Sequence, residues 1–378
     1  MKAFTNGDIY TSNGVLSDHA LLISGGQIHS IQNRADVPKD VALQDLGGKS
    51  IAPGFVDLQV NGGGGVLFNE QFDPQSVKTA VLAHQRTGAT SIFPTAFTAT
   101  FDAMRGLLET CVNLRNEGLA GIAGIHFEGP VINEAKAGVH DKRNIRPLDQ
   151  EITDFYISSA EQIPTLVTLA PEEVDLAYVT KLRNAGVLVF AGHTNATYER
   201  TSEAFEHGLQ GATHLYNAMS ALGSRAPGVV GAVLSQKDAF ASIILDGHHL
   251  HWASFRVAFD AMKKGNLFFV TDAMPCVGGD ITEFNLSDLR VFVKDGRCVT
   301  EDGTLAGSAL TMAQAAKNAV QKAGVPRAEA IRMGTSYPSN FAGLKHVGSL
   351  KPGARADFLV FSNEIDVTEV FVGGERLA

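Results

Sequence analysis

The sequence has few cysteines, no long apolar run and no excess of basic residues. Its three cysteines, Cys111, Cys276 and Cys298, include no CxxC pair. This spacing excludes a disulfide framework and a thiolate zinc site, and it predicts a reducing compartment, the cytoplasm. No apolar run reaches the ~18 residues of a membrane span, so we expect no membrane segment. With 31 basic and 40 acidic residues the net charge is −9, which argues against a general nucleic-acid or membrane-surface binder.

The chain also lacks the glycine-rich motifs of nucleotide-binding folds. No expected strand is followed by GxGxxG, and the glycine run 62–65 lacks the GK[ST] ending of a phosphate loop. By contrast, 44% of the 378 residues are hydrophobic and only 19% are charged. This composition excludes a disordered or fibrous chain and supports a sizeable core.

Both ends of the chain are expected to form short strands. The strand-like runs are 2–11, 19–24 and 27–32 at one end, and 356–361, 368–372 and 375–377 at the other. Gly25-Gly26 lies between two of these runs and predicts a hairpin, because both turn positions need a positive φ. We expect residues 1–52 and 346–378 to form one small β domain around a central unit at 53–345.

The central unit alternates apolar runs with amphipathic segments. The eight apolar runs are 55–60, 91–97, 124–127, 165–169, 187–191, 211–215, 242–245 and 267–271. The helical segments include 74–87, 101–117, 172–185, 196–207 and 251–264, with glycines placed to end them. Eight strands alternating with helices predict the α/β class and a (β/α)₈ TIM-type barrel, with a doubly wound open sheet as the alternative.

Side chains that can bind metal come at the ends of four of these runs. They are Glu128, His193, His214 and Asp272. In a barrel the C-terminal ends of the strands converge on one mouth, so we expect these residues to meet there. A glutamate and two histidines form the ligand set of a catalytic zinc site, and iron, manganese or cobalt would accept the same donors.

Taken singly, these residues also have structural interpretations. A histidine at a strand end is commonly only hydrogen-bonded, Glu128 could cap the turn that follows it, and Asp272 could cap a helix. Their joint placement favours the metal site, whereas His126 is interpreted as structural. Polar residues of nearby loops could clamp a phosphate or could be solvated loop charges; they are His140, Arg225 and His249.

Seven motifs occur in order along nearly the whole chain. They are PGFVDLQVNG at 53–62, HFEGP at 126–130, AGHTNA at 191–196, THLYNAM at 213–219, DGHH at 246–249, VTDA at 270–273 and GTLAGS at 303–308. Together they closely resemble the N-acetylglucosamine-6-phosphate deacetylase family of the amidohydrolase superfamily. The resemblance implies a barrel with a small β-sandwich built from both chain ends. It also implies hydrolysis of the N-acetyl amide of N-acetylglucosamine 6-phosphate to glucosamine 6-phosphate and acetate.

The resemblance implies catalytic roles residue by residue. Glu128, His193 and His214 would hold one divalent metal ion per subunit, zinc before iron, manganese or cobalt. The ion would lower the pKa of its water so that hydroxide attacks the amide. Asp272 would act as general base and then as general acid, and His140 would stabilise the oxyanion together with the metal.

The resemblance further implies how the phosphorylated amino sugar is held. The matching positions are Asn217, Ala218, Arg225, Asp246, His249, Leu305, Ala306 and Gly307. Because some phosphate contacts in this family come from the neighbouring subunit, a homodimer with a partly shared active site is implied. Arg225 and His249 are the expected contacts between subunits.

One position departs from the pattern of the wider superfamily. Many amidohydrolases carry His-x-His after the first strand, but this chain has Gln59-Val60-Asn61. Amides are poor zinc ligands, so we expect a second metal site near Gln59 and Asn61 to be absent or weak. Two rival functions stay open: another amidohydrolase, of the dihydroorotase or N-acyl-amino-acid deacylase kind, and a non-catalytic sugar-phosphate-binding protein. Glu128 in the place of a carboxylated lysine weakens the first rival, and the base Asp272 weakens the second.

Overall fold

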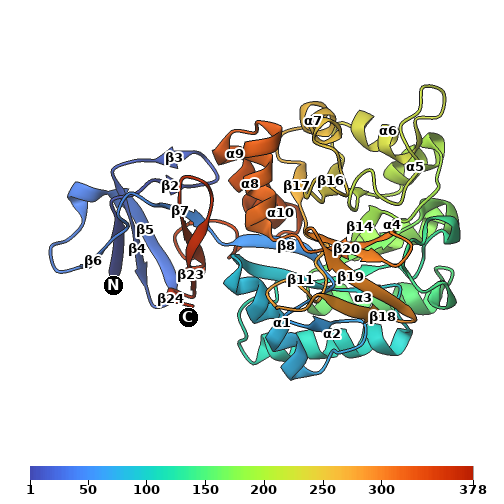
Figure 1. Cartoon of the computed structure of the whole chain (residues 1–378), viewed down its shortest axis with the longest axis horizontal. Helices are drawn as coiled ribbons and strands as arrows, with labels where there is room; N and C mark the ends of the chain where they lie inside the picture. Colours follow the sequence, from blue (N-terminus) through green and yellow to red (C-terminus); the bar gives the residue numbers. More distant parts are fainter. Residues whose placement is uncertain (378) are drawn as a thin grey trace.

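A parallel sheet curved into a barrel forms the core of the larger part of the molecule, on the right in Figure 1, in the computed structural model, which describes residues 1–377. Each strand pairs in parallel with the next one along the chain. The strands are β8 (Phe55–Val60), β11 (Ala89–Phe97), β12 (Ile125–Glu128), β13 (Thr165–Leu169), β14 (Leu188–Ala191), β15 (Gly211–Ala212), β16 (Phe240–Ile243) and β17 (Leu267–Phe269). Each of the eight predicted apolar runs overlaps one of these strands.

The first and last strands of this sheet meet, and this contact excludes the doubly wound alternative. The backbone N–H of Asp272, just after β17, donates to the carbonyl oxygen of Gln59 on β8 at 3.0 Å. Val60 and Ala273 form a parallel bridge beside it. The prediction of a (β/α)₈ barrel is therefore confirmed.

Helices surround the barrel strands (Figure 1). Those within the predicted segments are α1 (Pro74–Arg86), α2 (Phe101–Asn116), α4 (Leu176–Asn184), α5 (Tyr198–Glu206) and α7 (Trp252–Ala261). Asp73 caps α1 by accepting hydrogen bonds from the N–H groups of Gln75 and Ser76. The further helices are α3 (Gln150–Gln162), α6 (Gly228–Ser235), α8 (Met312–Ala323), α9 (Arg327–Gly334) and α10 (Ser336–Phe341). Within residues 1–377, none of the helices has the length and apolar character needed to cross a bilayer.

The two chain ends share one sheet beside the barrel, as the sequence predicts. One sheet has the strand order β24-β23-β22-β7-β2-β3, so it joins C-terminal strands to N-terminal ones. These strands are β2 (Ile9–Tyr10), β3 (Val15–Leu16), β7 (Ser50–Pro53), β22 (Phe358–Phe361), β23 (Val367–Val372) and β24 (Glu375–Arg376). The second sheet contains β1 (Lys2–Thr5), β4 (His19–Ser24), β5 (Gln27–Asn33) and β6 (Ala42–Asp45). Phe4, near the N-terminus, packs against two residues of the C-terminal strands: its ring centroid lies 4.8 Å from that of Phe358 and 5.2 Å from that of Phe371.

A four-stranded antiparallel sheet follows β17 and was not predicted from the sequence. Its strands are β18 (Glu283–Leu286), β19 (Leu289–Lys294), β20 (Arg297–Thr300) and β21 (Leu305–Ser308). β21 reaches the barrel through a parallel bridge between Ser308 and Ala273. This bridge brings the segment 305–307 next to Asp272, at the mouth of the barrel.

Candidate active site

The four predicted strand-end residues lie at the mouth of the barrel. Glu128 is the last residue of β12, while His193, His214 and Asp272 follow β14, β15 and β17 within a few residues. The last three have positive φ values of 46°, 34° and 55°, respectively. Non-glycine residues rarely adopt this conformation, and it concentrates at functional sites where the surrounding structure holds it.

Glu128, His193 and His214 direct their polar atoms at one point. The Oε1 atom of Glu128 lies 2.8 Å from Nε2 of His214 and 3.2 Å from Nε2 of His193, and the two nitrogens are 3.2 Å apart. Nδ1 of His193 is 2.8 Å from the carbonyl oxygen of Lys136. A carbonyl only accepts, so Nδ1 carries the proton and Nε2 offers a lone pair to the site. The separations are close to the ~3.3 Å between ligands of a tetrahedral ion with bonds of ~2.0–2.1 Å. The three residues therefore fit a divalent cation.

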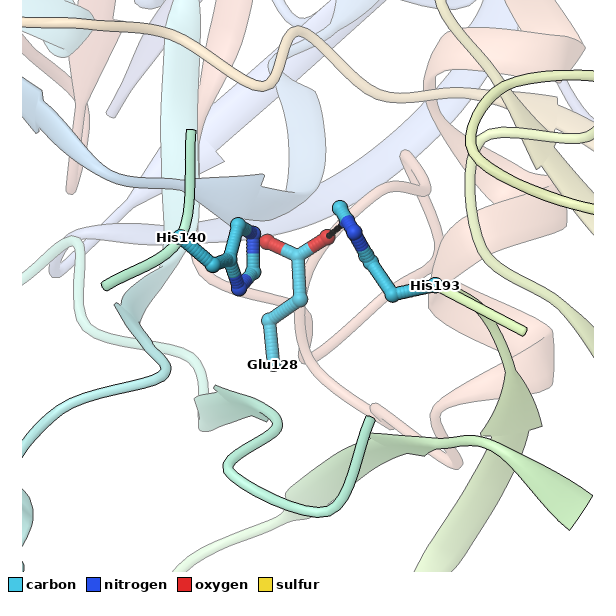
Figure 2. Close-up of side chains that lie close together, drawn as sticks. All are labelled: Glu128, His140 and His193. Atoms are coloured by element: carbon cyan, nitrogen blue, oxygen red, sulfur yellow. Dashed lines mark hydrogen bonds and ion pairs between the residues drawn. The ribbon is translucent and has the colours of Figure 1, made fainter. Parts of the chain in front are cut away.

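His140 lies on the other side of Glu128. Figure 2 shows the Glu128 carboxylate between the rings of His140 and His193. One ligand atom from each of these three residues falls within 4.8 Å of the other two. Nδ1 of His140 lies 2.6 Å from the Thr98 hydroxyl oxygen, so Nε2 is the ring nitrogen that does not contact Thr98. The buried Glu/His/His group indicates a divalent-metal site, and His214 rather than His140 has its nitrogen within 3.2 Å of both other donors.

The electrostatics differ among the buried titratable groups Glu128, His140 and Asp272. Burial alone would raise the pKa of Glu128, but the hydrogen bonds and charges of His193 and His214 outweigh it and hold that pKa well below its usual range. Burial, and then the charge of His193, lowers the pKa of His140 well below its usual range. For Asp272, burial followed by the charge of Glu128 raises the pKa to about 8. Of the two carboxylates, Asp272 is therefore the one that holds a proton more readily near neutral pH.

Two amide side chains orient the Asp272 carboxylate. Nε2 of Gln59 donates to Oδ1 of Asp272 at 3.0 Å, and Nδ2 of Asn61 donates to the same oxygen at 2.7 Å. The amide oxygens of Gln59 and Asn61 are buried without a protein hydrogen-bond partner. Sequence reasoning considered these residues only as poor metal ligands and missed their role as donors. Their i, i+2 spacing, with Gln59 on β8 and Asn61 directly after it, was the available signal, because residues two apart along an extended segment share a face.

A cavity of about 420 Å³ opens beside these residues. Its lining includes Glu128, His140, His193, His214 and Asp272 together with the predicted sugar-binding residues Asn217, Ala218, His249, Leu305 and Gly307. Apolar residues that the sequence did not single out also line it, namely Phe97, Val139, Ile244 and Met274.

Three predicted binding residues do not line this cavity. Ala306 is fully buried. Asp246 accepts a hydrogen bond from Nδ1 of the cavity-lining His249 at 2.7 Å. Arg225 lies exposed in the loop before α6. Among the cavity-lining residues of the described chain there is no lysine or arginine.

Two family models match this chain. The model described as "Amidohydrolase family" matches residues 50–377, and the model described as "NagA composite domain" matches residues 1–51. Together they span the barrel and the N-terminal strands.

Similar proteins carry names that specify a reaction. The chain is 36% identical to an N-acetylglucosamine-6-phosphate deacetylase of Haemophilus influenzae, over 99% of this chain and 98% of the relative. It is 35% identical to an N-acetylgalactosamine-6-phosphate deacetylase of a Shewanella species, over 97% of this chain and 93% of the relative.

Solved structures give the same result for the fold. A crystal structure of N-acetylglucosamine-6-phosphate deacetylase from Pasteurella multocida superposes with a TM-score of 0.95 at 37% identity, covering 100% of this chain and 99% of that one. A mutant of the Mycobacterium smegmatis enzyme, solved in complex with N-acetyl-D-glucosamine-6-phosphate, has a TM-score of 0.91 at 31% identity, covering 99% and 98%.

Proposed function

Since this chain belongs to the amidohydrolase family, we propose that it hydrolyses the N-acetyl amide of N-acetylglucosamine 6-phosphate to glucosamine 6-phosphate and acetate. The observation that carries the proposal is the placement of Glu128, His193 and His214 beside Asp272 in one cavity. Amide hydrolysis needs a group that activates water and a group that transfers a proton, and a cation site next to a carboxylate that can hold a proton provides both.

Glu128, His193 and His214 would hold one divalent ion per subunit. When bound, such an ion supplies Lewis-acid chemistry, because it makes water more acidic and polarises a carbonyl group. Imidazole and carboxylate donors suit zinc first, with iron, manganese and cobalt as alternatives. The amide N–H groups of Gln59 and Asn61 face Asp272, which supports a single tight ion rather than two.

Asp272 would move the proton. Its Oδ1 atom is occupied by two amide donors, so Oδ2 is the oxygen that can accept a proton from the attacking water. The same group then delivers this proton to the nitrogen of the departing amine, which cannot leave unprotonated. A pKa raised by burial favours taking up the proton, and a neighbouring cation would bring the pKa down and favour its release.

His140 would stabilise the negative charge that develops on the acetyl oxygen. If the Thr98 hydroxyl donates to Nδ1, the ring keeps its proton on Nε2. Because burial keeps the ring neutral, Nε2–H is available as a fixed donor without the cost of burying a charge. Asn217, Ala218, His249 and the 305–307 segment would hold the sugar ring and position the amide for attack.

The phosphate site would be completed by a second copy of the chain. A phosphate dianion needs cationic donors, yet His249 is the only residue of the sugar-binding set in the cavity that can be cationic. Arg225 is exposed and lies outside the cavity lining. We infer a homodimer in which Arg225 reaches the cavity of the neighbouring subunit.

Acetate release tests the proposal directly. We expect hydrolysis of N-acetylglucosamine 6-phosphate to exceed that of unphosphorylated N-acetylglucosamine and of N-acetyl amino acids. N-acetylgalactosamine 6-phosphate is the second candidate substrate, because the relative at 35% identity is named for it. Faster hydrolysis of N-acetyl amino acids would assign the chain to another amidohydrolase activity. If metal-loaded protein binds the phosphorylated sugar but releases no acetate, the chain is a sugar-phosphate-binding protein and not a deacetylase.

A further inference from the structure

The seam where the barrel closes carries Asp272. On one side lies β8, and on the other lies the segment 270–273 that follows β17. The Asp272 N–H donates to the Gln59 carbonyl at 3.0 Å, and the Asn61 N–H donates to the Ala273 carbonyl at 2.9 Å. The position of the Asp272 carboxylate therefore depends on how firmly this seam is held.

A second carboxylate, that of Asp57, lies inside the same seam. Asp57 is on β8 and is 0% exposed. Its Oδ1 accepts from the backbone N–H of Gln59 and from that of Thr271, both at 3.2 Å. Its Oδ2 accepts from the Thr271 hydroxyl at 2.5 Å. A single side chain thus holds both sides of the closure.

Both residues that Asp57 holds also help to place Asp272. Thr271 precedes Asp272 directly, and Gln59 contributes its carbonyl to the Asp272 N–H and its amide to Oδ1. Asp272 has a φ of 55°, which a non-glycine residue keeps only when surrounding contacts enforce it. Asp57 does not line the cavity, so it does not touch the substrate.

We propose that Asp57 is a positioning residue for deacetylation, which holds Thr271 and Gln59 so that the Asp272 carboxylate stays aimed at the attacking water. This inference rests on the proposed function, because it assigns Asp272 the proton transfer. A purely structural role in the core would affect folding in general, whereas a positioning role requires that the effect of Asp57 on catalysis passes through Asp272.

The first test compares Asp57→Ala with Asp57→Asn. A displacement of about 1 Å at a reacting group can cost ~10²-fold in rate, so we expect kcat of Asp57→Ala to fall by up to that factor. KM and metal content should stay near those of the unaltered protein, because the cation site and the sugar contacts lie on other strands. Asp57→Asn keeps an acceptor oxygen for the two N–H groups and should recover most of the lost kcat.

A double mutant separates positioning from a general structural effect. In an Asp272→Asn background, Asp57→Ala should change kcat by no more than about two-fold, because the group that it positions is gone. Loss of the full factor in both backgrounds would overturn the inference, and so would an unchanged kcat in folded, metal-loaded Asp57→Ala.

If Asp57→Ala fails to fold, variants of Thr271, which donates to Asp57, test the inference instead. Thr271→Val removes the hydroxyl donor while keeping the shape, and Thr271→Ser keeps the donor. We expect a lower kcat for Thr271→Val than for Thr271→Ser at equal metal content, and equal kcat values would overturn the inference. Absence of acetate release by the unaltered, metal-loaded protein would instead overturn the proposed function.

Discussion

The two halves of the active site use hydrogen-bonding groups in opposite ways. In the ligand side, formed by Glu128, His193 and His214, lone pairs converge at 2.8–3.2 Å. In the proton side, formed by Asp272, Gln59 and Asn61, two N–H donors converge on one carboxylate oxygen. The pKa of Glu128 is lowered and that of Asp272 is raised. Although both halves are buried carboxylate sites in one cavity, one is built to hold a cation and the other to hold a proton.

Removing a ligand should have the largest effect. His214→Ala should lose the divalent ion and reduce acetate release to background, because only two donors remain. His140→Ala is the matched control: it should keep the ion, while kcat falls by about 10²–10³-fold through loss of one oxyanion donor. Elemental analysis and kinetics of the two variants check this. Loss of the ion from His140→Ala, with retention in His214→Ala, would make His140 the third ligand.

Altering the proton side should affect the rate and spare the metal. Asp272→Asn keeps the shape of the side chain, so the ion and substrate binding should be retained. The catalytic constant should fall by ~10²–10⁴-fold, the range for a positioned general acid–base. Elemental analysis beside steady-state kinetics gives the answer. A folded variant without its ion would show that Asp272 is a ligand, which would erase the contrast between the two sides.

The pH dependence of the free energy of unfolding should show the titration of Asp57, the buried carboxyl group that contacts Gln59 of the proton side. Burial raises the pKa of Asp57 from 3.8 to about 7. Between these values the folded state keeps a proton that the unfolded chain releases, so this contribution to stability is full below about pH 4 and is lost as the pH rises through about 7.

Asp57→Asn removes this titration. Relative to the variant, the unaltered protein should lose stability of the order of 4 kcal/mol, as an upper limit, between about pH 4 and about pH 8. Urea unfolding of both proteins across this window, in the same metal state, measures the difference. Parallel stability profiles would show that Asp57 is ionised in the fold as in the unfolded chain.

Arg225 should have a smaller effect, confined to the phosphate. Arg225→Ala should raise KM for the phosphorylated sugar by the equivalent of about 1.5–3 kcal/mol, the value of a hydrogen bond to a charged group. The unphosphorylated sugar serves as the control and should be unaffected. Similar losses on both sugars would remove Arg225 from the phosphate site.

The shared site makes a separate prediction about mixtures. Mixing Arg225→Ala with Asp272→Asn protein should restore part of the activity, because a hybrid dimer contains one cavity with both residues intact. Subunit exchange would be verified by mass measurement of the hybrid. No recovery in verified hybrids would contradict a site shared between copies.

The strand ends could be predicted from the sequence because their signals are local. Each apolar run and the polar residue after it lie within a few positions, and barrel geometry then brings Glu128, His193, His214 and Asp272 together. The orientation of Gln59 and Asn61 could not be predicted, since their partner Asp272 is more than 200 residues away. The contacts of Asp57 with Thr271 were hidden for the same reason.

Other features lacked a clear local signal. The strands β18 and β19 show no regular alternation of buried and exposed residues, and β20 and β21 alternate over only four residues each, so their pattern does not separate them from loops. The place of Arg225 depends on a second copy of the chain, which no pattern within one sequence describes. The domain limits 1–52, 53–345 and 346–378 and the cytoplasmic location stay predictions.

A metal titration tests the central claim most directly. The protein is stripped with a chelator and then supplied with zinc in steps, while acetate release from N-acetylglucosamine 6-phosphate is followed. Three converging donors and two amides turned toward Asp272 predict that activity rises in proportion to bound metal and reaches its plateau at one ion per subunit. Full acetate release from the stripped protein, or a plateau only at two ions, would contradict the account.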